Sequence, residues 1–319
     1  MSVQITTAMV DQFTANFTML AQQRGSKLRE CVMLKTGIVG KRCSMDQIGS
    51  KVARKKTTRH SDTEYTDTPH ARRWLTLSDY FDADLVDDED KVRILSDPTS
   101  EYMQAIAWAL GRSMDDEIIS AFTAASVTGQ DGTSSVTWAP SAYDGTNGSA
   151  QVFIAHDFDE AGTLGDTGLT VSKLRVAKQI LDGRDVASSD EEERFIICSP
   201  VQITDLLRDE KATSSDYAQV KALVEGKIGQ FMGFTFKPLT RTKTVNATYG
   251  SGATDEQVCH CYVKSGLSLG IGRDITGRIT EMPTKHYSVQ AYGSMSIGAT
   301  RTEEAKVLEI RTQFPAATS

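Results

Sequence analysis

The sequence predicts an α+β fold, and three observations support this class. One long amphipathic helix is expected over residues 98–125, where apolar side chains recur every three or four positions. Residues 170–239 mix helical and strand patterns, and from residue 258 onward almost only strands and turns are indicated. The 319 residues show no internal repeat and are enough for two domains, or for one domain with insertions.

The composition is that of an ordinary soluble globular protein with a net charge of -7. This charge argues against an affinity for nucleic acid over the whole surface, because phosphate binding needs clustered Lys and Arg. No run approaches the roughly 18 apolar residues that cross a bilayer, and the amino terminus does not resemble an export signal. The five cysteines are therefore expected to be free thiols in a reducing cytoplasm.

The first expected element is an amphipathic helix in MVDQFTANFTMLAQQRGSKL, which ends near Gly25. Val10, Phe13 and Phe17 lie three and four residues apart, so they share one face of that helix. Between residues 32 and 52 the pattern becomes extended and mixed.

Residues 54–74, RKKTTRHSDTEYTDTPHARRW, are strongly polar, and Tyr65 is the only large apolar side chain before Trp74. Such a stretch cannot bury enough surface within its own chain to offset the entropy cost of ordering it. It is therefore either a disordered loop or an arm whose contacts lie on another molecule. Its charges change sign in blocks: Arg54, Lys55, Lys56 and Arg59, then Asp62, Glu64 and Asp67, then Arg72 and Arg73.

After this stretch the sequence passes from strand-like alternation into the acidic segment DYFDADLVDDED and then into the long helix. Pro98 and its Ser and Thr neighbours supply the start signals of that helix. At 1.5 Å per residue it would be about 40 Å long, which suits a structural spine. The expected apolar stripe is Met103, Ile106, Ala107, Leu110, Met114, Ile118 and Phe122.

Short strands are expected in SVTWA and QVFIAH, within the Gly-, Ser-, Thr- and Asp-rich residues 127–168. TVSKLRVAKQIL predicts a helix that Gly183 ends, and RFIIC predicts a buried strand. SPVQITDLL predicts a helix with Ser199 as its cap and Pro200 in its first turn. A glycine-containing turn then leads into a strand within GQFMGFTFKPL.

Three motifs could carry chemistry, and each has a simpler interpretation. The glycines of LGIGRDITG have the wrong spacing for a dinucleotide loop and are expected in turns. Asp82 and Asp84 lack the following oxygen ligand and glycine of a calcium loop, so a solvated or partner-facing acidic patch is favoured. Cys259 and Cys261 could bind zinc, but strand alternation sends His260 to the opposite face, which favours buried thiols.

Motifs of hydrolytic and phosphate-binding enzymes are absent from the sequence, so no catalytic residue, cofactor or metal site is predicted. A hydrolase of unrecognised type remains a third, weakly supported class. The histidines in polar sequence are expected to face solvent: His60, His70, His156 and His286.

The order of the segments resembles the major capsid proteins of tailed bacteriophages, with the Hong Kong 97 type of shell fold. The resemblance is carried by FTANFTMLAQQRGSKLR, ARRWLTLSDY, DPTSEYMQAIAWALGRSMDDEII, LRVAKQILDGRDV, RFIICSPVQITDLL, VEGKIGQFMGF and SIGATRTEEAKVLEIRT, and it spans nearly the whole chain. It implies an N-terminal arm (1–34), an extended β-hairpin loop (35–80), a peripheral domain with the spine helix (81–168), an axial domain (169–285), and a return strand with a C-terminal tail (286–319).

The resemblance implies a non-enzymatic coat protein that self-assembles into hexamers and pentamers of an icosahedral head around double-stranded DNA. The alternative is a cellular container shell of the same fold, such as an encapsulin. The implied partners are other copies of the chain, a separate scaffolding protein, a portal, a possible decoration protein and, non-specifically, the packaged DNA. Assembly is expected in the cytoplasm of a host bacterium, with no membrane partner.

In the family that the chain resembles, the extended loop and the N-terminal arm lie over neighbouring subunits, so their side chains are expected to form contacts between subunits. These expected contact residues are Phe13, Phe17, Arg54, Lys55, Lys56, Arg59, Asp62, Glu64, Asp67, Arg72, Arg73, Trp74, Asp87, Asp88, Glu89 and Asp90. Some relatives also join a loop lysine to an asparagine near the carboxyl terminus of a neighbour. The last asparagine here is Asn246, so no such cross-link is expected.

Overall fold

The computed structural model describes residues 22–59, 62, 63, 65–86, 99–145, 151–158, 167–184, 186, 192–208, 229–242, 244–247 and 254–314. The chain divides into two compact units. Unit 1 comprises Met1–Ser26, Ser78–Met114 and Gly272–Ile297, and unit 2 comprises Lys27–Leu77, Asp115–Ile271 and Gly298–Ser319. The predicted helix around Phe13 and Phe17 lies outside the described residues.

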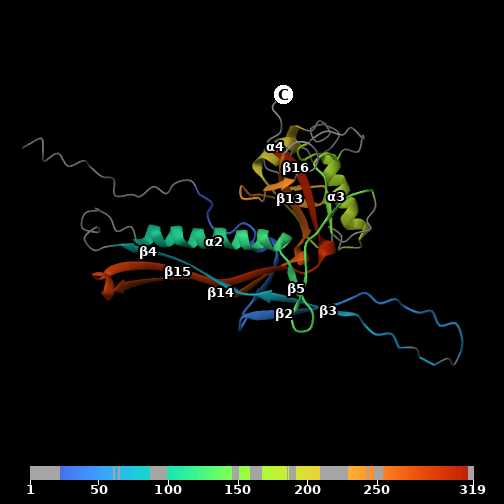
Figure 1. The fold of residues 1–319 in the computed structure, drawn as a ribbon, viewed down its shortest axis with the longest axis horizontal. Coiled ribbons are helices and arrows are strands. Elements are labelled where there is room, and N and C mark those ends of the chain that lie inside the picture. The colour runs from blue at the N-terminus through green and yellow to red at the C-terminus, as the bar shows by residue number, and fades with distance from the viewer. Residues whose placement is uncertain are drawn as a thin grey trace, which may run out of the picture. The chain divides into compact units, whose positions relative to one another are not determined.

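Unit 1 is built on the helix α2 (Thr99–Thr123) and on the strands β4 (Ser78–Val86), β14 (Leu267–Met282) and β15 (Ser288–Arg301). β15 runs antiparallel to β4, in register from Val289 opposite Val86 to Ile297 opposite Ser78. The boundary between the two units falls within α2, β14 and β15. The long helix predicted over residues 98–125 is confirmed (Figure 1).

The apolar stripe of α2 packs on the sheet because glycines in the strands leave room for it. A Cβ atom on Gly293 would overlap the side chain of Ile106 and come within 3.2 Å of Leu110. On β14, Met103 fills the space beside Gly277 in the same way. The glycines of LGIGRDITG were predicted in turns, and this is wrong, because all of them lie within the continuous strand β14.

The amino-terminal segment is fixed on α2 by close contacts. A Cβ atom on Gly111 would lie 2.7 Å from the backbone of Gly25, so only glycine allows this approach. The guanidinium of Arg24 lies 5.4 Å from the ring centroid of Trp108. In unit 2, the carboxylate of Asp115 accepts hydrogen bonds from the backbone N–H groups of Lys27 and Leu28.

Unit 2 contains an eight-stranded sheet with the order β10–β11–β9–β13–β16–β8–β7, and β12 pairs with β13 off this path. Its strands are β7 (Ser141–Ala142), β8 (Val152–Ile154), β9 (Arg194–Cys198), β10 (Gln230–Phe231), β11 (Phe234–Pro238), β12 (Thr244–Ala247), β13 (Thr254–Val263) and β16 (Val307–Phe314). The predicted strands RFIIC and QVFIAH are confirmed as β9 and β8.

The two helices predicted in TVSKLRVAKQIL and SPVQITDLL are confirmed as α3 (Val171–Gly183) and α4 (Pro200–Arg208). The side chain of Thr170 accepts a hydrogen bond from the backbone N–H of Lys173 at the start of α3. The hydroxyl of Ser199 accepts one from the N–H of Gln202 at 3.3 Å, which confirms the predicted cap of α4.

The core of unit 2 lies between α3 and the large sheet, and it includes Leu174, Ile180, Cys259 and Cys261. Burial raises the pKa of both thiols well above its usual value, so they stay protonated and pack as small apolar side chains. The prediction of buried thiols is confirmed. His260 stacks on Phe122 with ring centroids 4.3 Å apart.

Lys173 is a fully buried cation at the edge of this core. Its Nζ donates hydrogen bonds to the backbone oxygens of His156, Thr167, Gly168 and Arg311 at 2.8, 3.0, 3.0 and 3.3 Å. Burial lowers the pKa of Lys173 to about 8, since desolvation disfavours the ammonium. The side chain therefore ties three loop residues to β16.

Among the four histidines predicted to face solvent, His70 and His286 are exposed and His60 lies outside the described residues. The prediction is wrong for His156. Its Nδ1 lies 2.6 Å from Oε1 of Glu256, and both side chains are largely buried. The cause is long-range pairing, because Glu256 on β13 is distant in sequence.

A second sheet of unit 2 has the order β2–β3–β5–β6. Its strands are β2 (Arg42–Ile48), β3 (His70–Thr76), β5 (Ser126–Thr128) and β6 (Ser134–Val136). The strand predicted in SVTWA is therefore shorter and begins one residue earlier. β1 (Met33–Thr36) pairs in parallel with the start of β14, and single 3-10 turns lie at Arg29–Cys31, Lys264–Gly266, Pro283–Lys285 and Glu304–Lys306.

The end of β3 passes so close to Gly298 that a Cβ atom there would overlap the carbonyl oxygen of Thr76. We expect Gly298→Ala to lower the free energy of unfolding by about 1–3 kcal/mol, because the backbone must shift to admit the methyl group. Denaturant unfolding of the unassembled subunit measures this. Gly229→Ala is the matched control, because nothing lies within 4 Å of its added Cβ; equal losses in the two variants would contradict the close-packing account.

Candidate functional site

The segment between β2 and β3, residues 49–69, is called the arm here. The two strands pair antiparallel from Arg42 opposite Thr76 to Ile48 opposite His70, and the N–H of Gly49 donates to the carbonyl of Pro69 at 2.8 Å. Beyond this last contact the described residues of the arm have no helix or strand. Figure 1 shows them running on from the two strands as two extended legs.

The side chains of the arm are almost all exposed. Tyr65 is 92% exposed and Val52 is 85% exposed, which are high values for large apolar side chains. The predicted contact residues on the arm that the structure describes are likewise exposed: Arg54, Lys55, Lys56, Arg59, Asp62 and Asp67. These side chains are therefore accessible to a partner molecule.

The other predicted contact residues fall into two groups. Outside the described residues lie Phe13, Phe17, Glu64, Asp87, Asp88, Glu89 and Asp90. Described on β3, where the arm rejoins the sheet, are Arg72, Arg73 and Trp74. The intersubunit contacts of the residues outside the described part of the chain stay a prediction. Arg72, Arg73 and Trp74 each make contacts within their own chain.

Arg72 and Trp74 hold the sheet together at the root of the arm, which is the paired part of β2 and β3 next to it. The Nε of Arg72 donates to the carboxylate of Asp46 on β2, and the guanidinium lies 5.8 Å from the ring centroid of Trp74. The hydrogen bond from Arg72 lowers the pKa of the Asp46 carboxyl from its usual value. The indole N–H of Trp74 donates to the carbonyl of Gly129 at 2.8 Å. The hydroxyl of Thr128 donates to the backbone carbonyl of Arg72 at 2.9 Å.

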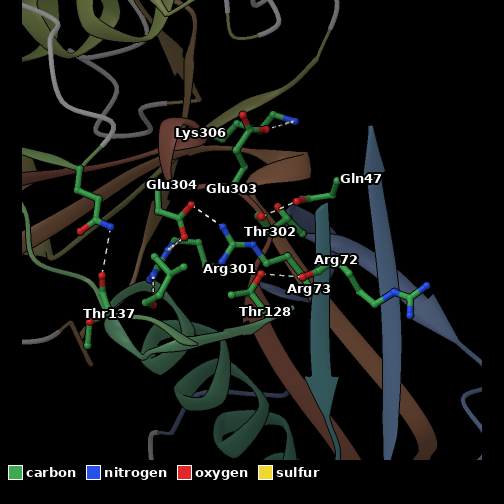
Figure 2. A network of polar contacts seen from close by, with 12 residues as sticks. Gln47, Arg72, Arg73, Thr128, Thr137, Arg301, Thr302, Glu303, Glu304 and Lys306 are labelled. Atoms are coloured by element: carbon green, nitrogen blue, oxygen red, sulfur yellow. Dashed lines mark hydrogen bonds and ion pairs between the residues drawn. The ribbon is translucent and has the colours of Figure 1, made fainter. Parts of the chain in front are cut away.

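Arg73 takes part in a buried ion network with Glu304 and Arg301, which we call the root network (Figure 2). The Nη2 of Arg73 donates to Oε2 of Glu304 at 2.6 Å. The other carboxylate oxygen of Glu304 lies 3.5 Å from Nε of Arg301. Because Arg73 is only 8% exposed, little of its surface can contact a neighbouring subunit.

Arg301 has no exposed surface, and its position is explained by the end of α2. The last carbonyl groups of a helix have no partner within the helix and carry a partial negative charge. The Nη1 of Arg301 donates to the carbonyls of Phe122 and Ala124 at 2.5 and 3.1 Å. Burial lowers the pKa of this guanidinium, and the charge of Glu304 opposes that shift.

Two further contacts complete the root of the arm. The guanidinium of Arg301 lies 4.7 Å from the ring centroid of Trp138, whose indole N–H donates to Oε1 of Glu309 at 2.5 Å. On β2, the side-chain amide of Gln47 donates to the carbonyl of Thr302 at 2.8 Å (Figure 2). Both strands that lead into the arm are therefore fixed to the turn after β15.

This network has only a weak signal in the sequence. Arg73 and Glu304 are 231 residues apart, and neither position carries a motif. The one visible feature is the charged segment TRTEEAK, which directly follows the alternating strand SIGA.

Over the described residues, no group of three or more His, Cys, Asp or Glu side chains is placed to hold a metal ion. None of the helices that the structure describes is both long and apolar enough to span a membrane. What these residues can do is anchor a charged arm and present it to another molecule.

Comparison with known proteins shows what the chain is similar to. A family model described as "Phage capsid protein" matches residues 5–313. None of the curated protein sequences compared with the chain is similar enough to count as a relative.

Solved phage capsids share the fold. The capsid of cyanophage Pam1 matches with a TM-score of 0.71 at 13% identity and covers 98% of both chains. The capsid of cyanophage P-SCSP1u matches with a TM-score of 0.69 at 14% identity, covering 97% of this chain and 94% of the other. The head of Helicobacter pylori bacteriophage KHP40 matches with a TM-score of 0.69 at 7% identity, covering 98% of both chains. The predicted shell fold is confirmed.

The root network generates a prediction about stability. Replacing Glu304 by Ala leaves the guanidinium groups of Arg73 and Arg301 buried without their shared carboxylate. We expect this change to lower the free energy of unfolding by about 3–5 kcal/mol. Denaturant unfolding of the unassembled subunit measures the loss.

The matched control is Glu303→Ala. Glu303 is the preceding residue, and its half-exposed carboxylate lies 3.3 Å from Nζ of Lys306. An exposed pair contributes about 0–1 kcal/mol, so this change should have little effect. Similar losses in both variants would mean that burial of the network does not matter.

Proposed function

The chain belongs to the phage capsid protein family, and from this premise we propose that it builds an icosahedral phage head as hexamers and pentamers around double-stranded DNA. It is a structural protein of the virion, a major capsid protein. The alternative of an encapsulin-like cellular container is not favoured, because the family match and the similar structures described above are phage capsid proteins.

The observation that carries the proposal is the combination of an exposed arm with a rigid root. The arm exposes charges of both signs and an aromatic ring, and ordering it on its own would cost entropy without burying apolar surface. The root network holds β3, and the hydrogen bond from Gln47 to Thr302 holds β2, so the arm leaves the sheet in a defined direction. This arrangement supports a role in which the arm is ordered by a neighbouring subunit.

Many modest contacts, repeated by symmetry, would then stabilise the shell. Weak individual contacts also allow a misplaced subunit to leave. The net charge of -7 suits a wall that does not bind packaged DNA tightly.

The proposal includes partners and parts that follow from the family. The partners are a separate scaffolding protein, a portal, a possible decoration protein and non-specifically held DNA. Synthesis and assembly take place in the cytoplasm of a host bacterium. The division into an N-terminal arm, extended loop, peripheral domain, axial domain and return strand, with the boundaries given above, is also part of the proposal.

The first test concerns the assembly state. If the arm finds its partner on a neighbour, the purified protein should form large oligomers or shells, or should do so when a scaffolding protein is added. Negative-stain electron microscopy and sedimentation velocity show this directly. A monomer that stays unassembled under all conditions, with the arm ordered on its own body, would contradict the proposed function.

The second test concerns the basic half of the arm. Reversing Arg54, Lys55, Lys56 and Arg59 to Glu replaces attraction to an acidic neighbour by repulsion and should block or misdirect assembly. Each exposed pair is worth only about 0.2–1 kcal/mol, so reversal of Arg54 alone should be tolerated. The wild-type shell should also loosen as salt rises, because the Debye length falls to about 3 Å at 1 M.

The control for this test reverses the expected partner. The fourfold arm variant is combined with Lys at Asp87, Asp88, Glu89 and Asp90, and assembly is followed by sedimentation across a range of salt concentrations. Recovery in the combined variant would identify the pairing. Normal assembly of the fourfold arm variant would show that these charges only keep the arm soluble.

A further inference from the structure

Three of the five cysteines lie together in the core of unit 2. Cys198 is the last residue of β9, and Cys259 and Cys261 lie on the neighbouring strand β13. None of the three has exposed surface, and all three belong to the apolar cluster that packs against α3. The pairing of the two strands decides which of these thiols lie close to each other.

The register of β9 and β13 places Cys198 directly opposite Cys259. The two strands run antiparallel, and Ile197 lies opposite His260. One step further along the same register, Cys198 faces Cys259. Both side chains point to the α3 side of the sheet, since they share the core cluster there.

The backbone hydrogen bonds show which kind of pair this is. Facing residues of an antiparallel pair alternate between hydrogen-bonded and non-hydrogen-bonded pairs. The N–H of Lys264 donates to the carbonyl of Glu193 at 3.0 Å, so the backbone groups of every second residue from Glu193 point to β13. The carbonyl of Cys198 accepts from the N–H of Leu239, on the other side of β9. Cys198 and Cys259 therefore form a non-hydrogen-bonded pair, whose Cα atoms lie about 4.5 Å apart.

This spacing suits a disulfide between the two strands. A disulfide joins residues whose Cα atoms lie about 4.4–6.8 Å apart. Cys261 lies opposite Ile196, so it reaches Cys198 only along the diagonal, where the distance is about 7–8 Å. The geometry thus selects Cys259 over Cys261 as the partner of Cys198.

We propose that Cys198 and Cys259 are a redox-sensitive pair that forms a disulfide between β9 and β13 in an oxidising medium and thereby stabilises the large sheet of unit 2. In a reducing medium the two thiols stay free. The shell of a virion meets an oxidising medium once the particle has left the cell. The chemistry concerns the folded chain alone, so it does not depend on the proposed assembly.

Hydrogen peroxide is a sufficient oxidant for this step. One thiolate attacks an oxygen of the peroxide, which gives a sulfenic acid and releases hydroxide. The second thiolate attacks that sulfur, the disulfide forms, and a second hydroxide leaves. The two thiol protons convert both hydroxides to water. The sulfur pair loses two electrons, and the peroxide gains them.

Burial makes the reaction slow, because the thiolate is the form that reacts. It raises the pKa of Cys198 to about 12 and the pKa of Cys259 well above its usual value. The buried ammonium of Lys173 opposes the shift at Cys259 without cancelling it. Brief contact with an oxidant therefore leaves the pair reduced, and long exposure is needed to form the bond.

Peptide mapping of the oxidised full-length chain tests the proposal. Cys43 is replaced by Ser, because it is the one cysteine that is not buried. The folded protein is kept in dilute hydrogen peroxide for a day, the remaining thiols are alkylated in denaturant, and the chain is cut with trypsin without reduction. Mass spectrometry should find residues 195–208 joined to residues 244–264. Fragment masses should assign at least tenfold more of this link to Cys259 than to Cys261.

Two variants that each remove one buried sulfur from β13 are the matched controls. The link should persist in Cys261→Ala and fall at least tenfold in Cys259→Ala. Denaturant unfolding checks that both variants are folded. If Cys259→Ala does not fold, the fragment masses from the chain with both cysteines still decide between the two partners.

Two results would overturn the proposed pair. One is a link that joins Cys198 mainly to Cys261, or that is equally abundant in the two variants. The other is a folded chain in which Cys198 and Cys259 both stay reduced, although the same peroxide treatment oxidises the chain unfolded in urea.

The thermal stability of the linked protein gives an independent readout. The bond closes a loop from residue 198 to residue 259, which contains α4 and the strands β10, β11 and β12, and so restricts the unfolded chain. We expect the oxidised protein to unfold about 5 °C or more above the reduced protein. Cys198→Ala treated with the same peroxide should show no such rise, which controls for methionine oxidation. An unchanged midpoint in a fully linked sample would reject the stabilising role.

Discussion

A charged arm can bind a neighbour specifically only if the chain that carries it is held at its base, and here the base is held by the buried carboxylate of Glu304. This group lies between the guanidinium groups of Arg73 and Arg301. Arg73 belongs to β3, which leads out of the arm, and Arg301 belongs to β15. One buried carboxylate therefore fixes the arm to the rest of unit 2.

The network is costly to build, since two guanidinium groups and a carboxylate lose most of their hydration. Arg301 offsets part of this cost because it also donates to the carbonyls of Phe122 and Ala124 at the end of α2, where the last carbonyls have no partner within the helix. An apolar residue at this position could pack equally well, but it would remove this donor from the buried carbonyl of Phe122. The same contacts that end the long helix thus position the arm.

Local patterns predicted the elements whose causes are local. The cap at Ser199 and the apolar stripe of α2 depend on neighbours within a few residues, and both appear in the structure. The root network depends on residues 231 positions apart, and no periodicity can show such a pairing. His156 illustrates the same limit, because its polar surroundings in sequence conceal a buried partner on β13.

The division of the arm into a basic half and an acidic half has a consequence for specificity. An arm with one sign of charge would bind any surface of opposite sign in many registers. With both signs present, shifting or reversing the arm on the proposed neighbour would bring like charges together, so the wrong arrangements would be repelled. Because each exposed ion pair is weak and screened by salt, the correct arrangement remains reversible until symmetry repeats it around the shell. We infer that a fixed base and an arm with charges of both signs would together allow errors to be corrected during assembly without making the finished shell weak.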